Sequence, residues 1–303
     1  MELLSKAVPI AMLVFVVSSM LAVGVSLTVA QIVAPLRNGK LVSLALLANF
    51  VLMPLGALAI ARLLRLDEPL GIALLLLGAA AGAPFLPKLA AIAKSNLAFA
   101  VGLMVLLMVL TVGYMPLVLP LLLEGVSVDP TKIARSLVLL MLLPLGAGLL
   151  VKARFFRVAH RIRPPLNRTS SLSLAVLIVL LLVTKIQNVI ALFGTRGILA
   201  SILFLLGGVG IGWVLGGPGF GTKGVLALGT AQRNIAAALV VGGKNFDDPN
   251  VLVMVVMVAV VRLLILMPLA RALGARSTEV QEASNTSVGS QYGSVAEEEN
   301  RET

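Results

Sequence analysis

A short polar cluster interrupts an apolar stretch in the last third of the chain: Gly229-Thr230-Ala231-Gln232-Arg233-Asn234. Arg233 is ten residues from Lys223, which is about 15 Å along a helix and near the midplane of a bilayer core about 30 Å thick. A guanidinium stays charged in proteins and pairs with a carboxylate through two parallel hydrogen bonds. Gln232, Asn234 and Thr230 can hydrogen-bond the same ligand. The cluster therefore predicts a site for an anion.

No acidic residue accompanies this charge inside an apolar stretch. The 13 acidic residues lie at the N-terminus, in polar joints or in the C-terminal tail: Glu2, Asp67, Glu68, Glu124, Asp129, Asp247, Asp248 and six from Glu279 onward. A carboxylate-based coupling site for sodium or protons is therefore not expected. Arg233 must be satisfied by backbone carbonyls, by water or by an anionic ligand. A structural arginine that holds loose carbonyls where helices cross is the alternative.

A second segment with unusual backbone requirements lies in the first half of the chain: Gly78-Ala79-Ala80-Ala81-Gly82-Ala83-Pro84-Phe85-Leu86-Pro87-Lys88. Pro84 and Pro87 remove backbone donors and clash with the preceding turn, so a helix is expected to break here. We expect these prolines to line the same site as Arg233. Lys88 either approaches that cavity or extends to the cytoplasmic surface. Asn49, an isolated polar residue, either packs between helices or contacts the cavity.

The composition indicates the class of protein that positions these residues. The chain has 303 residues, of which 59% are hydrophobic and 12% charged, whereas soluble domains are about 45–50% apolar and about 25% charged. This excludes a soluble globule and a disordered chain and predicts an all-α polytopic membrane protein. The net charge of +11 is attributed to basic loops that face anionic lipid rather than to nucleic-acid binding.

The residue types also restrict the chemistry. There is no cysteine and one histidine, His160, which is assigned to a basic loop. No metal site and no cofactor is expected. An enzyme is not expected either, because the apolar stretches hold no Ser/His/Asp set, cysteine or metal cluster.

Charges and turn residues divide the chain into apolar stretches. We predict nine membrane spans: 7–33, 41–64, 69–94, 96–123, 133–152, 170–190, 197–217, 222–243 and 249–270. Residues 1–275 are predicted to form one transporter domain. Residues 276–303 are polar and are predicted to be a disordered cytoplasmic tail. Three glycines spaced by four residues, Gly208, Gly212 and Gly216, predict close packing of the seventh span against another helix.

The distribution of Lys and Arg predicts the orientation. The densest basic run follows the fifth span: Lys152, Arg154, Arg157, Arg161, Arg163 and Arg168. Placing this run in the cytoplasm puts the N-terminus outside and the C-terminus inside. The expected location is the cell membrane, where the chain is surrounded by lipid.

The two interrupted spans hold matching positions. The span 69–94 is third in the first group of four (7–123), and the span 222–243 is third in the last group of four (170–270). The single span 133–152 links the groups, so they run in opposite directions. A 4+1+4 inverted-topology repeat with broken helices at matching positions is typical of a transporter binding site.

With these features, the chain resembles the bile acid:sodium symporter family over all nine spans, as a divergent bacterial-type member. The resemblance rests on three segments: Ser19 to Leu27 in the first span, Ile92-Ala93-Lys94-Ser95-Asn96 after the third, and Gly229-x-x-x-Arg233-Asn234 in the eighth. The resemblance implies a panel domain and a core domain, with the two broken helices crossing in the core. It also implies transport of organic anions such as bile acids, pantoate or keto acids, usually coupled to sodium.

The departures from the family pattern fall on its sodium ligands. The family's Glu and Gln stand at Gly229 and Arg233, and its Ser-Asn pair stands at Leu86-Pro87. Its hydroxyl ligands stand at Met104, Leu107 and Met108. Sulfur and aliphatic carbon cannot replace the oxygen ligands of a hard cation. The usual sodium sites are therefore expected to be lost, with altered residues in their place.

These observations predict a transporter that moves a small organic anion, most naturally a carboxylate, by alternating access, either facilitative or secondary-active. Arg233 supplies the charge that sodium supplies in relatives. One alternative is a sodium-coupled symporter with a rearranged ion site at Thr230, Gln232 and Asn234. Another is a non-transporting sensor or scaffold on the same fold. The substrate, the coupling ion, the direction of transport and the oligomeric state are left open.

Overall fold

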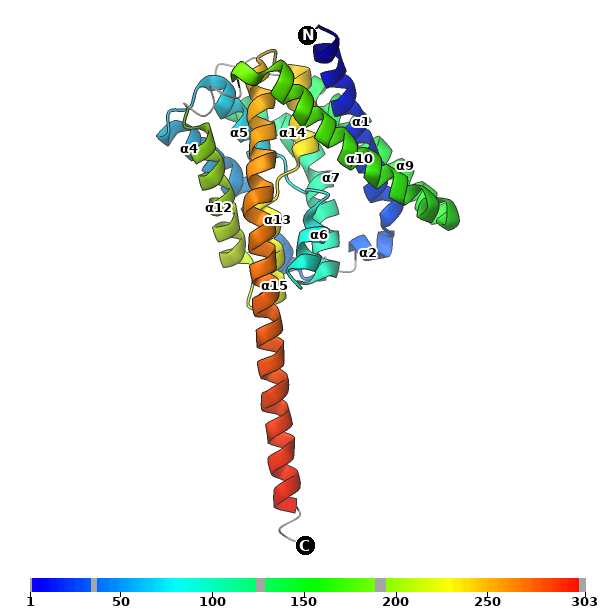
Figure 1. The fold of residues 1–303 in the computed structure, drawn as a ribbon, viewed down its shortest axis with the longest axis vertical. Helices are drawn as coiled ribbons and strands as arrows, with labels where there is room; N and C mark the ends of the chain where they lie inside the picture. The colour runs from blue at the N-terminus through cyan, green and yellow to red at the C-terminus, as the bar shows by residue number, and fades with distance from the viewer. Residues whose placement is uncertain (1, 34–36, 124–128, 189–194, 300–303) are drawn as a thin grey trace.

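The computed structural model describes residues 2–33, 37–123, 129–188 and 195–299, and every element in these ranges is a helix (Figure 1). The first half holds α1 (Glu2–Ser26), α2 (Val29–Val33), α3 (Gly39–Leu47), η2 (Ala48–Leu52), α4 (Met53–Leu63), α5 (Glu68–Ala79), α6 (Leu86–Ile92) and α7 (Leu97–Leu122). The second half holds α8 (Pro130–Leu137), η3 (Val138–Leu142), α9 (Leu143–Arg154), α10 (Phe156–Thr184), α12 (Gly197–Leu215), α13 (Phe220–Ala231), α14 (Ile235–Asn245) and α15 (Pro249–Glu299).

Within the described residues, 8 helical runs are long and apolar enough to cross a membrane. They are Lys6–Ser26, Gly39–Leu63, Leu97–Leu122, Pro130–Arg154, Phe156–Thr184, Gly197–Leu215, Phe220–Asn245 and Pro249–Ser277. The third expected span, 69–94, contains the shorter apolar helix α5 instead. The protein is therefore an all-helical, polytopic integral membrane protein.

Both interruptions that the sequence predicts are present. The first helix break, residues 80–85, separates α5 from α6. Gly82 within it has a φ of +75°. A Cβ at Gly82 would lie 2.2 Å from the Met108 nitrogen of α7, so only glycine allows this approach. The second break covers residues 232–234, between α13 and α14. Asn234 caps α14, and its side chain accepts a hydrogen bond from the Ala237 N–H at 3.1 Å.

Two other membrane-length runs contain a π-helical turn just before a proline. The turn η2 precedes Pro54, and the turn η3 precedes Pro144. Proline has no N–H, so it leaves an upstream carbonyl without its helical donor. In η2 the Met53 N–H donates to the Ala48 carbonyl. The carbonyls of Asn49 and Phe50, which a residue at position 54 would otherwise serve, need donors from other helices.

The sequence interpretation was wrong about the joint between the fifth and sixth spans. Lys152 and Arg154 end α9, and the other basic residues of that joint lie in the first half of α10, which contains His160, Pro164 and Pro165. Most of these positions are exposed, so solvent or lipid headgroups can satisfy the carbonyls that two prolines leave free. The first span was also drawn too long. The helix α1 ends at Ser26, and residues 29–33 form the separate helix α2.

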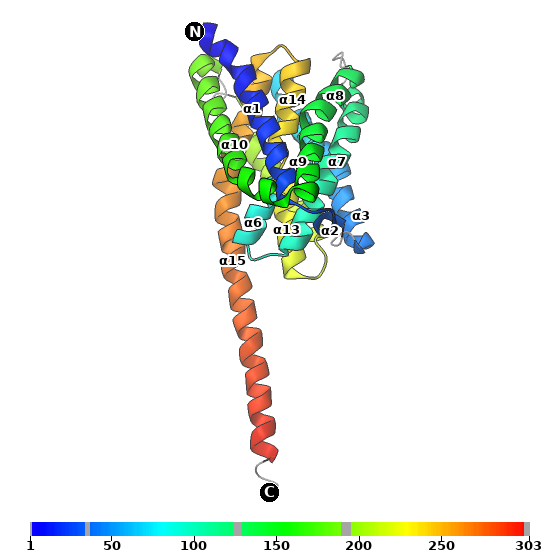
Figure 2. The ribbon, with the colours of Figure 1, turned by 90° about the vertical axis from the view of Figure 1, so that its right-hand side faces the viewer.

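Two groups of helices can be distinguished by their packing. The helix α1 packs along α9 and α10 (Figure 2). The helices α4, α5, α12, α13 and α15 pack on one another. Contacts of α14 with α1 and α8, and of α7 with α2 and α8, join the two groups.

The glycines of α12 permit close packing against α13, as the sequence predicts. A Cβ at Gly208 would lie 2.9 Å from the Ala231 Cα, and one at Gly212 would lie 2.2 Å from the Leu226 carbonyl oxygen. Both distances are too short for a side chain. Small residues at a helix contact let two backbones approach closely, and here they hold α13 in place up to its break.

The helix α15 continues beyond the rest of the molecule (Figures 1 and 2). Its polar part covers 276–299, within the segment for which the sequence predicts disorder. The Ser277 hydroxyl donates to the Lys94 carbonyl at 3.4 Å. A polar helix held by helix propensity alone is marginal in water. Disorder of residues 276–303 in solution stays a prediction, and amide hydrogen exchange would measure it.

Candidate functional site

Arg233 belongs to the second helix break, and its side chain reaches the end of α5 at the first break. It is completely buried. Its guanidinium has five N–H donors, and five hydrogen bonds use them. Nε donates to the Leu77 carbonyl at 2.8 Å. Nη1 donates to Asn49 Oδ1 at 2.7 Å and to the Thr230 carbonyl at 3.2 Å. Nη2 donates to the Gly78 carbonyl at 2.6 Å and to the Asn49 carbonyl at 3.4 Å.

Four of these five acceptors are backbone carbonyls at helix ends or in a π-helical turn, and the Leu77 carbonyl also accepts the Ala80 N–H at 3.2 Å. Leu77 and Gly78 lie at the C-terminal end of α5, and Thr230 lies at the C-terminal end of α13. The last carbonyls of a helix have no intrahelical donor. The Asn49 carbonyl belongs to the π-helical turn that Pro54 interrupts. One arginine side chain thus donates hydrogen bonds to carbonyls at the ends of α5 and α13 and in the π-helical turn η2.

Asn234 joins the two breaks directly. Its N–H donates to the Ala80 carbonyl at 2.9 Å, and its Nδ2 donates to the Gly82 carbonyl at 3.0 Å. Its side-chain oxygen caps α14 at the same time. The segment 80–82 and the segment 232–234 are therefore crossed and hydrogen-bonded to one another.

The helix α7 supports the first break from its other side. Thr111 Oγ1 accepts a hydrogen bond from the Ala81 N–H at 3.0 Å and donates to the Ala81 carbonyl at 3.1 Å. The Tyr114 hydroxyl donates to the Phe50 carbonyl, the second carbonyl that Pro54 leaves free. The sequence analysis did not single out Thr111 or Tyr114. The sequence feature that could have identified them is a hydroxyl group within the apolar helix that follows the first break.

Of the positions where the resemblance places sodium ligands, those other than Gly229 and Arg233 carry apolar side chains. A Cβ at Gly229 would lie 3.0 Å from Leu86 Cδ2 and 3.8 Å from Leu103 Cδ2. Leu86, Met104 and Met108 are buried. Among the residues that the structure describes, no group of three or more His, Cys, Asp and Glu could hold a metal ion.

The other predicted site residues differ in burial and in their distance from the Arg233 cluster. Gln232 is 1% exposed, and neither its Oε1 nor its Nε2 has a hydrogen-bond partner. Pro84 and Pro87 are half-buried in and after the first break. Lys88 is exposed, with its Nζ 5.2 Å from the centre of the Phe85 ring, and is not part of the Arg233 cluster.

Asn49 lies among the partners of Arg233, whereas packing between helices was one of the two interpretations of this residue from the sequence. It is completely buried. Its Nδ2 donates to the Ala45 carbonyl at 3.0 Å and to Thr230 Oγ1 at 3.3 Å, while its Oδ1 accepts from Arg233. With all five donors engaged, the geometry favours a structural role for Arg233. Direct contact of its guanidinium with a ligand stays a prediction.

Arg262 of α15 reaches the second break from another direction. Its Nη1 donates to the Arg233 carbonyl at 3.1 Å. It is 7% exposed, and its Nε has no hydrogen-bond partner. The sequence analysis did not include Arg262 in the predicted site. Its place in the middle of an apolar stretch was the available signal.

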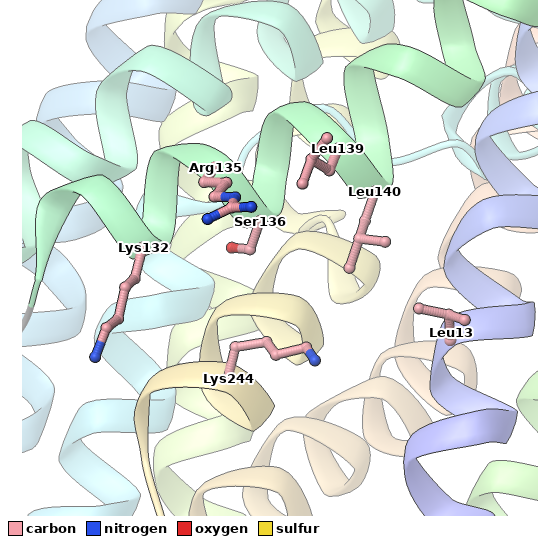
Figure 3. Close-up of a pocket in the computed structure, with 7 residues that line it drawn as sticks. All are labelled: Leu13, Lys132, Arg135, Ser136, Leu139, Leu140 and Lys244. Atoms are coloured by element: carbon pink, nitrogen blue, oxygen red, sulfur yellow. The ribbon is translucent and has the colours of Figure 1, made fainter.

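A separate cleft of about 330 Å³ lies between the two helix groups, near the ends of α8 and α14. Figure 3 shows three basic side chains around it, Lys132 and Arg135 from α8 and Lys244 from α14, with Leu13 of α1 on the opposite wall. Ser136, Leu139 and Leu140 complete the lining. A cleft with cations on one side and apolar walls on the other is suited to attract an organic anion.

Comparisons with known proteins agree with this architecture. The sequence model of the Sodium Bile acid symporter family matches residues 11–192, which include the first break and end before Arg233. A curated relative from Arabidopsis thaliana, "Probable sodium/metabolite cotransporter BASS6, chloroplastic", is 27% identical over 245 residues. The alignment covers 77% of this chain and 60% of that relative, so the chain spans less than two thirds of the relative's length. The chain belongs to the sodium bile acid symporter family.

Proposed function

We propose that the protein carries a small organic anion across the membrane by alternating access, with Arg233 as a tethered cation in place of sodium. The observation that supports this most directly is the cage around the guanidinium. Four backbone carbonyls and one amide oxygen surround a charge for which no acidic side chain among the described residues supplies a partner. Backbone and amide carbonyl oxygens are also ligands of hard cations.

A tethered cation changes the energetics of transport. Sodium bound at such a place would leave with each cycle, whereas Arg233 stays. The positive potential at the crossed breaks is therefore permanent. It attracts an anion through the low-dielectric interior without direct contact. Transport by this protein should follow the gradient of the substrate and need no sodium.

The experiment is uptake into proteoliposomes of two labelled carboxylates, cholate and a branched 2-keto acid. Uptake should be the same in sodium and in choline buffer. Counterflow against unlabelled substrate should also be seen, because a carrier exchanges substrate. Uptake that requires sodium supports the alternative of a rearranged sodium site, for which the unpartnered amide oxygen of Gln232 is the available ligand. Binding without counterflow favours a sensor or scaffold.

A reversal variant tests the role of Arg233 specifically. Replacing three of the altered positions by the residues of the family pattern gives L86S/G229E/R233Q. The change at Leu86 makes room, because Leu86 fills the space beside Gly229. The variant exchanges a fixed cation for oxygen ligands and should gain sodium-dependent uptake. The single variant L86S is the matched control and should stay sodium-independent.

The finer topology is part of the same proposal. We infer nine spans in a 4+1+4 inverted repeat, with α5 and α6 together forming the third span. The panel would then be the group of α1, α9 and α10, and the core would hold both breaks. The cell membrane, an outside N-terminus and an inside C-terminus complete the proposal. Because the chain has no cysteine, single cysteines at Asp248 and Lys223 can be tested for labelling from opposite sides.

A further inference from the structure

Arg262 differs from Arg233 in how its guanidinium is satisfied. Its Nη1 donates to the Arg233 carbonyl, and within the described residues no other hydrogen bond of the Arg262 side chain is present. Four of its five N–H donors are therefore unused, and those on Nε and Nη2 include a pair on one edge of the planar group. Two parallel N–H bonds on one edge match the two oxygens of a carboxylate.

The charge of Arg262 also lacks a counterion. No acidic residue in the described part of the chain forms an ion pair with Arg262. A buried charge without a partner is strongly unfavourable, and inside a membrane it marks an ion or substrate path. Arg262 contacts the backbone of Arg233, whose own guanidinium is held by neutral acceptors. The second break is therefore served by two arginines, of which only Arg262 has a free guanidinium edge.

Gln232 provides an independent observation at the same break. It is 1% exposed, and both ends of its amide lack partners. Such a group costs free energy unless a ligand or water completes its hydrogen bonds. It directly precedes Arg233, whose carbonyl Arg262 holds. The second break thus has two nearly buried polar side chains with unused atoms, Gln232 within it and Arg262 bonded to its backbone.

We infer that Arg262 is the residue that binds the transported anion directly, and that this anion is an organic monocarboxylate. The inference rests on the proposed function and specifies its site. One free edge of one guanidinium accommodates one carboxylate. Arg233 cannot offer a second edge, because its five donors are engaged. Gln232 supplies a further hydrogen bond to the bound molecule.

The test is binding of cholate and a branched 2-keto acid to the full-length protein in detergent, measured by calorimetry. R262Q should weaken binding about 10- to 100-fold, because two charge-assisted hydrogen bonds are lost. R262K keeps the charge but lacks the planar edge, so its affinity should lie between wild type and R262Q. R271Q, an exposed arginine on the same helix, is the matched control and should bind like wild type.

A ligand without charge separates direct contact from a structural effect. The amide of cholate lacks the carboxylate, and its weak binding should be equal in wild type and R262Q. Equal loss of acid and amide binding in R262Q overturns the inference, as does unchanged binding of the acid. If R262Q does not fold, wild-type affinity in R262K also overturns it. If wild type binds no carboxylate, the proposed function fails as well, whereas failure confined to the Arg262 variants leaves it standing.

Discussion

Replacement of Arg233 by methionine should destabilise the protein much more than the same replacement at Arg262. Both changes remove a buried guanidinium from the same break and insert an apolar side chain of similar length. They differ in the number of hydrogen bonds lost. Arg233 makes five, three of which are between 2.6 and 2.8 Å, whereas Arg262 makes one at 3.1 Å.

The magnitudes follow from this difference. Losing three short charge-assisted bonds costs roughly 4.5–9 kcal/mol at about 1.5–3 kcal/mol each. Removing a charge from the membrane interior returns about 2.5–3.5 kcal/mol. The net loss for R233M is therefore roughly 1–6.5 kcal/mol. R262M loses one bond of about 1.5–3 kcal/mol, so its net change should lie between a gain of about 2 kcal/mol and a loss of about 0.5 kcal/mol.

The free energy of unfolding can be measured by denaturant titration in mixed micelles. The single tryptophan, Trp213, lies on α12, which packs closely against α13, and its fluorescence reports on the core. R233K serves as an intermediate, because it keeps the charge with fewer donors. If R233M is as stable as R262M, the five bonds do not hold the crossed breaks together and the structural role assigned to Arg233 is wrong.

Three further predictions concern other parts of the molecule. T111V removes both hydrogen bonds to Ala81 and should lower the unfolding free energy by about 1–3 kcal/mol, whereas T111S should retain most of it. G212V should abolish stable expression, because its side chain would meet the α13 backbone. G210V should be tolerated, because nothing lies within 4 Å of a Cβ there. K244E should slow uptake of an anion at low salt, and the difference from wild type should shrink at high ionic strength; a salt-independent effect would contradict a steering role for the cleft.

Much of the architecture is predictable from the sequence because it depends on local properties. Apolar stretches of membrane length specify spans, and Pro84, Pro87 and the polar run 229–234 specify breaks, since they act on their own backbone. The same local reasoning failed at Pro164 and Pro165. Those prolines lie on an exposed helix, where the environment satisfies the carbonyls that they leave free.

The site was only partly predictable. The sequence identified Arg233, Asn234, Thr230 and Asn49 as chemically unusual. In the structure Arg233, Thr230 and Asn49 are hydrogen-bonded to one another, whereas Asn234 donates to the carbonyls of the first break. The sequence placed Lys88 with them, although that side chain is exposed. It did not single out Thr111 or Tyr114, because a hydroxyl in an apolar helix has no local pattern that reveals which carbonyl it serves.

The sequence alone determined that the chain spans the membrane, where two of its helices break, and that a positive charge lies in its interior without an acidic partner. Only the tertiary structure decided which arginine is satisfied and which has unused donors. The acceptors of Arg233 come from residues 155, 156 and 184 positions away along the chain. Hydrogen-bond satisfaction is a property of such distant contacts, so composition and spacing cannot specify it.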